Sequence, residues 1–181
     1  MTPQPYRSIV VVDYDPAWPM VFEEVRAKLT KLLGNIVNEV AHVGSTSVPG
    51  LSAKPKIDVD VILESDAQIP LASSRLQAAG YTAHGNKYND GMWAFTLGRG
   101  SFGERVYLCA LGNETHHKRL IFRDHLRNHP DDAAAYAALK KRLASETDHD
   151  WEYYTGSKRP FVDEILRKAA KISRSAQHGD L

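Results

Sequence analysis

The chain has 181 residues, a formal net charge of +1, 43% hydrophobic residues and 25% charged residues. These values are typical of a single globular domain, and they exclude a disordered or fibrous chain. The near-neutral charge argues against bulk binding to nucleic acid or to anionic membranes. No apolar run approaches the roughly 20 residues that a membrane helix needs. Because the single cysteine, Cys109, cannot form an internal disulfide and the N-terminus lacks a signal-like segment, we expect a cytoplasmic protein without a membrane partner.

Hydrophobic periodicity predicts alternating helices and strands in the first 112 residues. Asp15 and Pro16 are typical of a helix start, and apolar residues at spacings of three and four follow as far as Gly34, which predicts an amphipathic helix. Residues 56–63 (KIDVDVIL) alternate between apolar and other side chains, as a strand does. The other elements expected here are an extended lead-in or strand at 8–14, a helix at 67–79, and strands at 36–43, 81–84, 91–97 and 105–111, the last two forming a hairpin.

The last third of the chain is expected to be helical. Helix signals predict helices at 115–129, 131–147 and 159–172. The resulting expectation is one domain over 1–181. It has a mixed α/β core at 1–112, helices at 113–172 packed on that core, and a loose polar tail at 173–181.

The strand at 56–63 carries two carboxylates, Asp58 and Asp60. Residues two apart on a strand project from the same face, about 7 Å apart. Two ionised carboxylates at that spacing repel each other unless a cation lies between them, and Mg²⁺ favours such oxygen ligands. Asp58 and Asp60 are therefore candidate metal ligands and catalytic residues. The alternative is that the motif is a solvated strand edge.

A loop rich in turn-forming residues precedes this strand. Gly44, Ser45 and Thr46 directly follow the strand expected at 36–43. Glycine permits close backbone approach, and consecutive N–H groups in such a loop can bind an anion. A phosphate-binding loop next to two carboxylates suits phosphoryl or nucleotidyl transfer. The alternative is a turn that only shapes the chain.

Three cations are further candidates for binding phosphate. Lys54 and Lys56 flank the entry to the strand with the two aspartates, and surface lysines on a loop are an equally good interpretation. Arg123 lies within a stripe of arginines at 119, 123 and 127 on one helical face. A binding role or a structural ion pair would both explain it.

Several long stretches resemble one known family. They include HVGSTSVPGLSAKPKIDVDV at 42–61, FRDHLRNHP at 122–130 and YAALKKRLA at 136–144. On these motifs the chain resembles the GrpB family, a group assigned to the nucleotidyltransferase superfamily. The resemblance implies an α/β (α+β) nucleotidyltransferase-like fold, a mixed β-sheet flanked by helices and followed by an α-helical C-terminal third. It also implies that Gly44 and Ser45 form the phosphate loop and that Asp58 and Asp60 bind the metal.

One part of the chain departs from that pattern. The superfamily has a third carboxylate on a later strand, and the strand expected at 105–111 carries none, with Glu104 only at its start. Tyr107 and Cys109 stand where the family shows a His-x-His-like pattern. Either Glu104 completes the metal site or the site is incomplete.

Two functions from different classes follow. The first is a Mg²⁺-dependent nucleotidyltransferase that moves a nucleotidyl group from a nucleoside triphosphate to a small acceptor. The alternative is a non-catalytic nucleotide- or anion-binding or interaction module on the same fold. In both, the expected partner is a nucleotide or another phosphorylated small molecule. Nucleic acid is a weaker candidate, because no aromatic residues interleave the arginine stripe.

Overall fold

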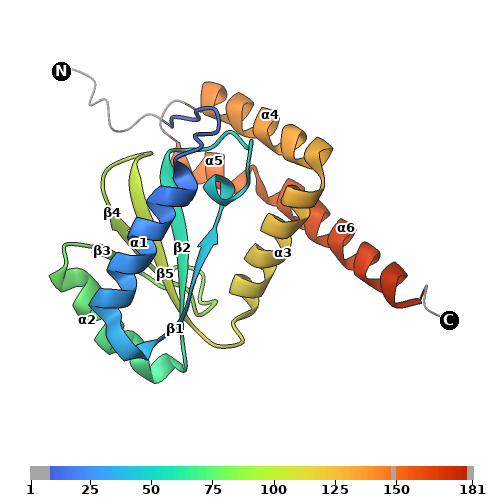
Figure 1. Cartoon of the computed structure of the whole chain (residues 1–181). Coiled ribbons are helices and arrows are strands. Elements are labelled where there is room, and N and C mark those ends of the chain that lie inside the picture. Colours follow the sequence, from blue (N-terminus) through green and yellow to red (C-terminus); the bar gives the residue numbers. More distant parts are fainter. Residues whose placement is uncertain (1–8, 148–149, 179–181) are drawn as a thin grey trace, which may run out of the picture.

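The computed structural model of the chain describes residues 9–147 and 150–178. It contains a mixed sheet flanked by helices, with the helical last third against one side (Figure 1). The strands are β1 (Val37–Val43), β2 (Lys56–Leu63), β3 (Thr82–Gly85), β4 (Trp93–Leu97) and β5 (Gly103–Ala110). The helices are α1 (Trp18–Leu33), α2 (Ile69–Ala78), α3 (Glu114–Asn128), α4 (Pro130–Glu146), α5 (Trp151–Gly156) and α6 (Arg159–His178).

The sheet has five strands in the order β1-β2-β5-β4-β3. The central pair β2–β5 is parallel, whereas β1–β2, β5–β4 and β4–β3 are antiparallel. This arrangement confirms the mixed sheet and the hairpin expected between β4 and β5. It also places the middle of β2 between two neighbouring strands, so that both of its aspartates lie within the sheet rather than at an edge.

Alternate side chains of β2 project from opposite faces of the sheet, into two different layers of the molecule. Val59 and Val61 are fully buried in a core formed with α1 and α2. On the other face, Ile62 packs with Cys109 of β5 and with Leu120 of α3. Since Asp58 and Asp60 share that second face, they point toward the layer that contains α3.

The first helix begins later than the sequence suggested. Asp15 lies before α1, where its carboxylate accepts a hydrogen bond from the N–H of Ala17 at 2.8 Å. Helix α1 ends where expected, at Gly34, whose φ of +66° is a conformation that glycine adopts readily. The lead-in before this helix makes one β-bridge, between Val12 and Ala53, and the N–H of Val10 donates to the hydroxyl of Ser101 at 3.0 Å, but the lead-in forms no strand of the sheet.

The C-terminal helices differ from expectation in two ways. The six-residue α5 was not predicted, and Asp150 caps it by accepting hydrogen bonds from the N–H groups of Glu152 and Tyr153. Helix α6 continues to His178, so residues 173–178 are helical and not the loose tail that their polar composition suggested. Residues 179–181 of the expected tail lie outside the described part of the chain. Within the described ranges, no helix combines the length and apolar character needed to cross a bilayer.

Candidate functional site

The glycine loop and the first aspartate lie against each other. Val43 pairs with Asp58 in the β1–β2 ladder, and Gly44 follows at once with a φ of +72°. A Cβ atom at position 44 would lie 2.6 Å from Oδ2 of Asp58. Glycine is therefore required here both for its backbone conformation and for the close approach of the carboxylate.

The residues after Gly44 form a single turn of 3-10 helix. Ser45 is half-buried, whereas Thr46 is buried and its hydroxyl hydrogen-bonds to Nε2 of His42 at 3.0 Å. The hydroxyl of Ser47 donates to the carbonyl of Gly44 at 2.5 Å. Of the predicted phosphate-binding loop, Gly44 and Ser45 thus remain reachable by a ligand, while Thr46 holds the turn against β1.

The second aspartate is enclosed by α3. Asp60 is fully buried, and Nη1 of Arg119 lies 2.7 Å from its Oδ1 while Nδ1 of His116 lies 2.9 Å from its Oδ2. The guanidinium of Arg119 also lies 3.8 Å from the centre of the Tyr107 ring. Both carboxylate oxygens therefore already have a partner from α3, and Asp60 fastens that helix to the sheet.

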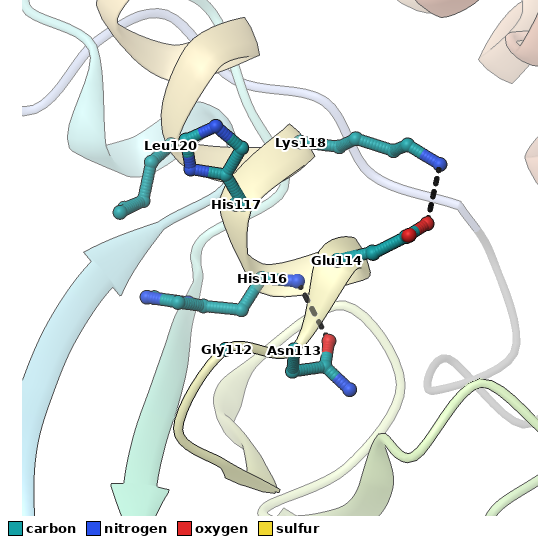
Figure 2. A pocket seen from close by; sticks show the side chains of 7 residues that line it. All are labelled: Gly112, Asn113, Glu114, His116, His117, Lys118 and Leu120. Atoms are coloured by element: carbon teal, nitrogen blue, oxygen red, sulfur yellow. Dashed lines mark hydrogen bonds and ion pairs between the residues drawn. The ribbon is translucent and has the colours of Figure 1, made fainter.

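A cavity of about 710 Å³ lies beside His116, at the start of α3 (Figure 2). Asn113 caps the helix there, and its side-chain oxygen accepts the N–H of His116 at 2.9 Å. His116 consequently lies between this cavity and the buried carboxylate of Asp60. The residues that line the cavity are Gly112, Asn113, Glu114, His116, His117, Lys118 and Leu120.

Glu104 does not supply the third carboxylate. It pairs with Ile57 in the parallel ladder, so its side chain leaves the sheet on the face opposite the aspartates. There it lies 2.5 Å from Nζ of Lys28 and accepts a hydrogen bond from the hydroxyl of Tyr81. On the aspartate face, β5 places Arg105 opposite Asp58. Of the two alternatives left by the sequence, completion of the site by Glu104 is therefore excluded.

The carboxylate of Asp58 acts on six cationic side chains, of which Lys56 is bonded to the carbonyl of Gly100 and Arg119 to Asp60. We call the other four the cation cluster. They come from the loop before β2, from β5, from α4 and from the segment between α5 and α6. Burial is the largest influence on the pKa of each of the four and leaves the pKa of the three lysines below its ordinary value, whereas the negative charge of Asp58 favours the charged form of all four. The cation cluster consists of Lys54, Arg105, Lys140 and Lys158.

Two amines of the cluster have no acceptor. Nζ of Lys54 and Nζ of Lys158 lie 5.0 Å and 4.3 Å from the centre of the Tyr154 ring, and neither makes a hydrogen bond or ion pair within the described residues. Burial lowers the pKa of Lys54 to about 7 and that of Lys158 to about 8. The hydroxyl of Tyr154 is itself buried without a hydrogen-bond partner in the described chain. Buried polar groups are rarely left in this state, and within the described residues neither amine has an anion as a hydrogen-bond or ion-pair partner.

Two of the predicted phosphate-binding cations are occupied elsewhere. Lys56 donates to the carbonyl of Gly100 at 2.7 Å. Arg123 donates to the carbonyl of His42 at 3.0 Å and pairs with Asp124 at 2.7 Å. Of the predicted cations, Lys54 is thus the one that belongs to the cluster.

Sequence reasoning missed three members of the cluster. One signal was present for Lys140, which is spaced four residues after Tyr136 and three before Leu143, on the buried face of α4. Its ammonium donates to the carbonyl of Ser52. Arg105 carried no comparable signal, because its role arises only when distant elements meet. Lys158 belongs, with Tyr154 and Phe161, to a segment that resembles the GrpB family, but the resemblance assigned it no role.

The side chains around the two aspartates do not fit Mg²⁺ as they are arranged. Asp60 has both oxygens engaged, and the position facing Asp58 on β5 is Arg105. Among the described residues, no group of three or more histidine, cysteine, aspartate or glutamate side chains is placed to hold a metal ion. The same arrangement does suit an anion.

A family model described as "GrpB protein" matches residues 8–168. The chain belongs to the GrpB family. It is 33% identical to the conserved protein GrpB from Enterococcus faecalis, whose crystal structure superposes with a TM-score of 0.81 over 91% of this chain and 99% of that one. It is 30% identical over 97% of its length to the UPF0157 protein YqkA from Bacillus subtilis, and it spans half of that relative.

The fold of this GrpB protein is shared by a wider group of proteins. The Cid1 poly(U) polymerase, in a structure with Mg and 3′-dATP bound, matches 75% of this chain and 43% of that chain with a TM-score of 0.50 at 16% identity. At that identity the likeness concerns the fold alone. It confirms the nucleotidyltransferase-like fold class that the sequence motifs implied.

Proposed function

We propose that this GrpB protein binds a phosphate-bearing small molecule, such as a nucleoside triphosphate, at the cation cluster and without a metal ion. The observation that carries the proposal is the pair of amines on Lys54 and Lys158, which have no acceptor in the described chain although four cations share the carboxylate of Asp58.

The energetic reasoning starts from burial. Removing an ammonium group from water disfavours its charged form, which is why the pKa of each cluster lysine lies below its ordinary value. A phosphate group placed among these amines would supply the missing counter-charge and accept hydrogen bonds from them. Lysine suits this role as a point charge with three donors. Gly44 and Ser45, which lie against Asp58, would form the opposite wall of the site.

A second candidate is Mg²⁺-dependent nucleotidyl transfer. Asp58 and Asp60 do share one face of β2 next to the glycine loop, which favours it. For that function Arg119 and His116 would have to release Asp60, at the cost of leaving a buried guanidinium without its partner. The metal-independent site needs no such rearrangement, and we therefore prefer it.

Titration calorimetry with inorganic tripolyphosphate, in buffer containing EDTA, tests the proposal. We expect saturable binding to the full chain that weakens at least tenfold in Lys158→Met. The matched control is Lys118→Met, on the exposed part of α3, where Lys118 lies 3.6 Å from Glu114; it should leave the affinity unchanged.

The thermal stability of the variants separates a binding role from a structural one. Because Lys158 is half-buried with no acceptor, Lys158→Met should unfold at the same temperature as the wild type or higher. Equal affinities of the wild type, Lys158→Met and Lys118→Met for tripolyphosphate would contradict the proposal. Binding of tripolyphosphate only when Mg²⁺ is present would contradict it as well.

A further inference from the structure

Asp58 is a hydrogen-bond acceptor without a donor. Its side chain is half-buried, and within the described part of the chain neither of its oxygens makes a hydrogen bond or an ion pair. Asp60, two residues further along the same strand, has both oxygens bonded. An ionised carboxylate accepts hydrogen bonds at both oxygens and donates none. Asp58 therefore has free capacity to accept a hydrogen bond from a ligand.

The position of this carboxylate is fixed from two sides. Arg105 is its direct partner in the parallel β2–β5 ladder, so the two side chains leave neighbouring strands on the same face of the sheet. On the β1 side, a Cβ atom at Gly44 would lie 2.6 Å from Oδ2 of Asp58. The charge of Asp58 also acts on the two amines without an acceptor, those of Lys54 and Lys158. The unpaired acceptor and the unpaired donors thus belong to one group of side chains.

An oxyanion among these side chains meets donors and an acceptor at once. The amines and the guanidinium of the cation cluster offer hydrogen bonds to its oxygens, whereas Asp58 repels an oxyanion that has no proton. A proton on the oxyanion removes this conflict, because its O–H group can donate to the carboxylate in a charge-assisted hydrogen bond. Hydrogen phosphate keeps such a proton near neutral pH, and a terminal phosphate group can carry one. Sulfate and the phosphodiester groups of nucleic acids carry none.

We propose that Asp58 makes the cation cluster selective for phosphate groups that carry a proton, and that it excludes sulfate and phosphodiesters. This selectivity rests on the proposed function, because the cations must bind an anion before Asp58 can discriminate between anions. It goes further in naming the class of ligand, which is free phosphate or a terminal phosphate group. A site that hydrogen-bonds a hydroxyl group of its ligand rejects an analogue without that group, because the site is then left with an unpaired polar atom.

Competition against tripolyphosphate tests this selectivity. The full chain is titrated with tripolyphosphate in buffer containing EDTA near neutral pH, with phosphate, sulfate or chloride added at equal ionic strength. We expect phosphate to compete at least about tenfold more strongly than sulfate. Arsenate carries a proton as phosphate does, and selenate lacks one as sulfate does. Arsenate should therefore follow phosphate and selenate should follow sulfate, whatever the central atom.

The variant Asp58→Asn replaces the carboxylate by an amide, which both donates and accepts hydrogen bonds. We expect sulfate to compete at least about tenfold better with this variant than with the wild type, so that the two anions compete about equally. The matched control is Asp124→Asn, because Asp124 pairs with Arg123 on α3 and is half-exposed; it should keep the wild-type preference. Circular dichroism confirms that both variants are folded, and the comparison of the four anions on the wild type is decisive without them.

The outcomes separate this selectivity from the anion site itself. Equal competition by phosphate and sulfate on the wild type, with tripolyphosphate still bound, would overturn the selectivity and leave the anion site in place. A preference for phosphate that persists in folded Asp58→Asn would overturn the role of Asp58. If tripolyphosphate did not bind to the wild type, both the selectivity and the proposed function would be wrong.

Discussion

Asp58 and Asp60 are two residues apart on β2, yet their surroundings differ in kind. Asp60 is fully buried and accepts one hydrogen bond on each oxygen, from Arg119 and His116. Asp58 instead lies between the glycine loop and four cations. The carboxylate of Asp60 is therefore structural in this arrangement, and that of Asp58 belongs to the proposed anion site.

Replacing Asp60 should destabilise the fold. In Asp60→Asn the guanidinium of Arg119 would stay buried without its counter-charge, and we expect a loss of about 3–5 kcal/mol in the free energy of unfolding in urea. The matched control is Asp124→Asn, because Asp124 pairs with Arg123 but is half-exposed; its loss should stay below about 1 kcal/mol. Similar losses for the two variants would mean that Asp60 is not the anchor of α3.

Gly44 offers a test of the contact between the loop and Asp58. Gly44→Ala would combine a left-handed backbone conformation with a Cβ atom 2.6 Å from Oδ2 of Asp58. Gly50→Ala is the natural control, since Gly50 has a φ of +77° and no atom within 4 Å of its would-be Cβ. We expect Gly50→Ala to cost about 1 kcal/mol and Gly44→Ala to cost about 1–3 kcal/mol more in urea unfolding. Equal costs would show that the loop moves away from Asp58 freely.

At the scale of elements, α3 is held to the first part of the chain by its arginine stripe. Arg119 binds Asp60, Arg123 donates to the carbonyl of His42, and Arg127 donates twice to the carbonyl of Ser47. The stripe that the sequence offered as an anion-binding face thus docks the helix onto β1, β2 and the glycine loop. Of the two interpretations of Arg123, the structural one fits these contacts.

The cluster lysines should make stability depend on pH in a defined direction. The pKa of Lys54 falls from its ordinary 10.5 to about 7 on folding, chiefly through burial. Between pH 7 and 9 the unfolded chain therefore keeps a proton that the folded chain has released, so the free energy of unfolding rises with pH. Urea unfolding of the ligand-free protein should show this rise, and Lys54→Met should show a smaller one. A rise of the same size in both proteins would mean that Lys54 keeps an ordinary pKa when folded.

Some elements could be predicted from the sequence because their signal is local. The bounds of β2 follow from the alternation of its side chains, and Gly34 ends α1 as its position indicated. Helix α5 has only six residues and no complete amphipathic period, which explains why it was missed. The prediction that the glycine loop lies beside the two carboxylates also depended only on residues that are close together in the sequence.

The composition of the site could not be predicted, because it arises from distant pairings. Arg119 is 59 residues from Asp60, and Lys140 is 88 residues from the carbonyl that it binds. No sequence window contains both partners of either contact. The missing third carboxylate did indicate an incomplete metal site, but only the folded chain shows that Arg105 takes the facing position.

At the scale of the whole molecule, the proposed anion site draws on both parts of the chain. The sheet supplies Asp58 and Arg105, whereas the C-terminal helical part supplies Lys140, Lys158 and the Tyr154 ring. In the nucleotidyltransferase-like fold of this GrpB protein, the layer containing α3 covers the aspartate face of the sheet (Figure 1). The division into a core at 1–112 and packed helices at 113–172 stays a prediction, but the shared site gives a reason to expect one cooperative unit.

Tripolyphosphate binding to the wild type and to Asp58→Asn, with EDTA or with excess Mg²⁺ at equal ionic strength, tests the central claim most directly. Removing the carboxylate leaves the cation cluster with more positive charge, so we expect Asp58→Asn to bind at least as tightly as the wild type. We also expect no gain in affinity from Mg²⁺ for either protein. Circular dichroism of the variant confirms that it is folded. Binding that requires Mg²⁺ and is lost in folded Asp58→Asn would contradict the account and favour the metal-dependent transferase.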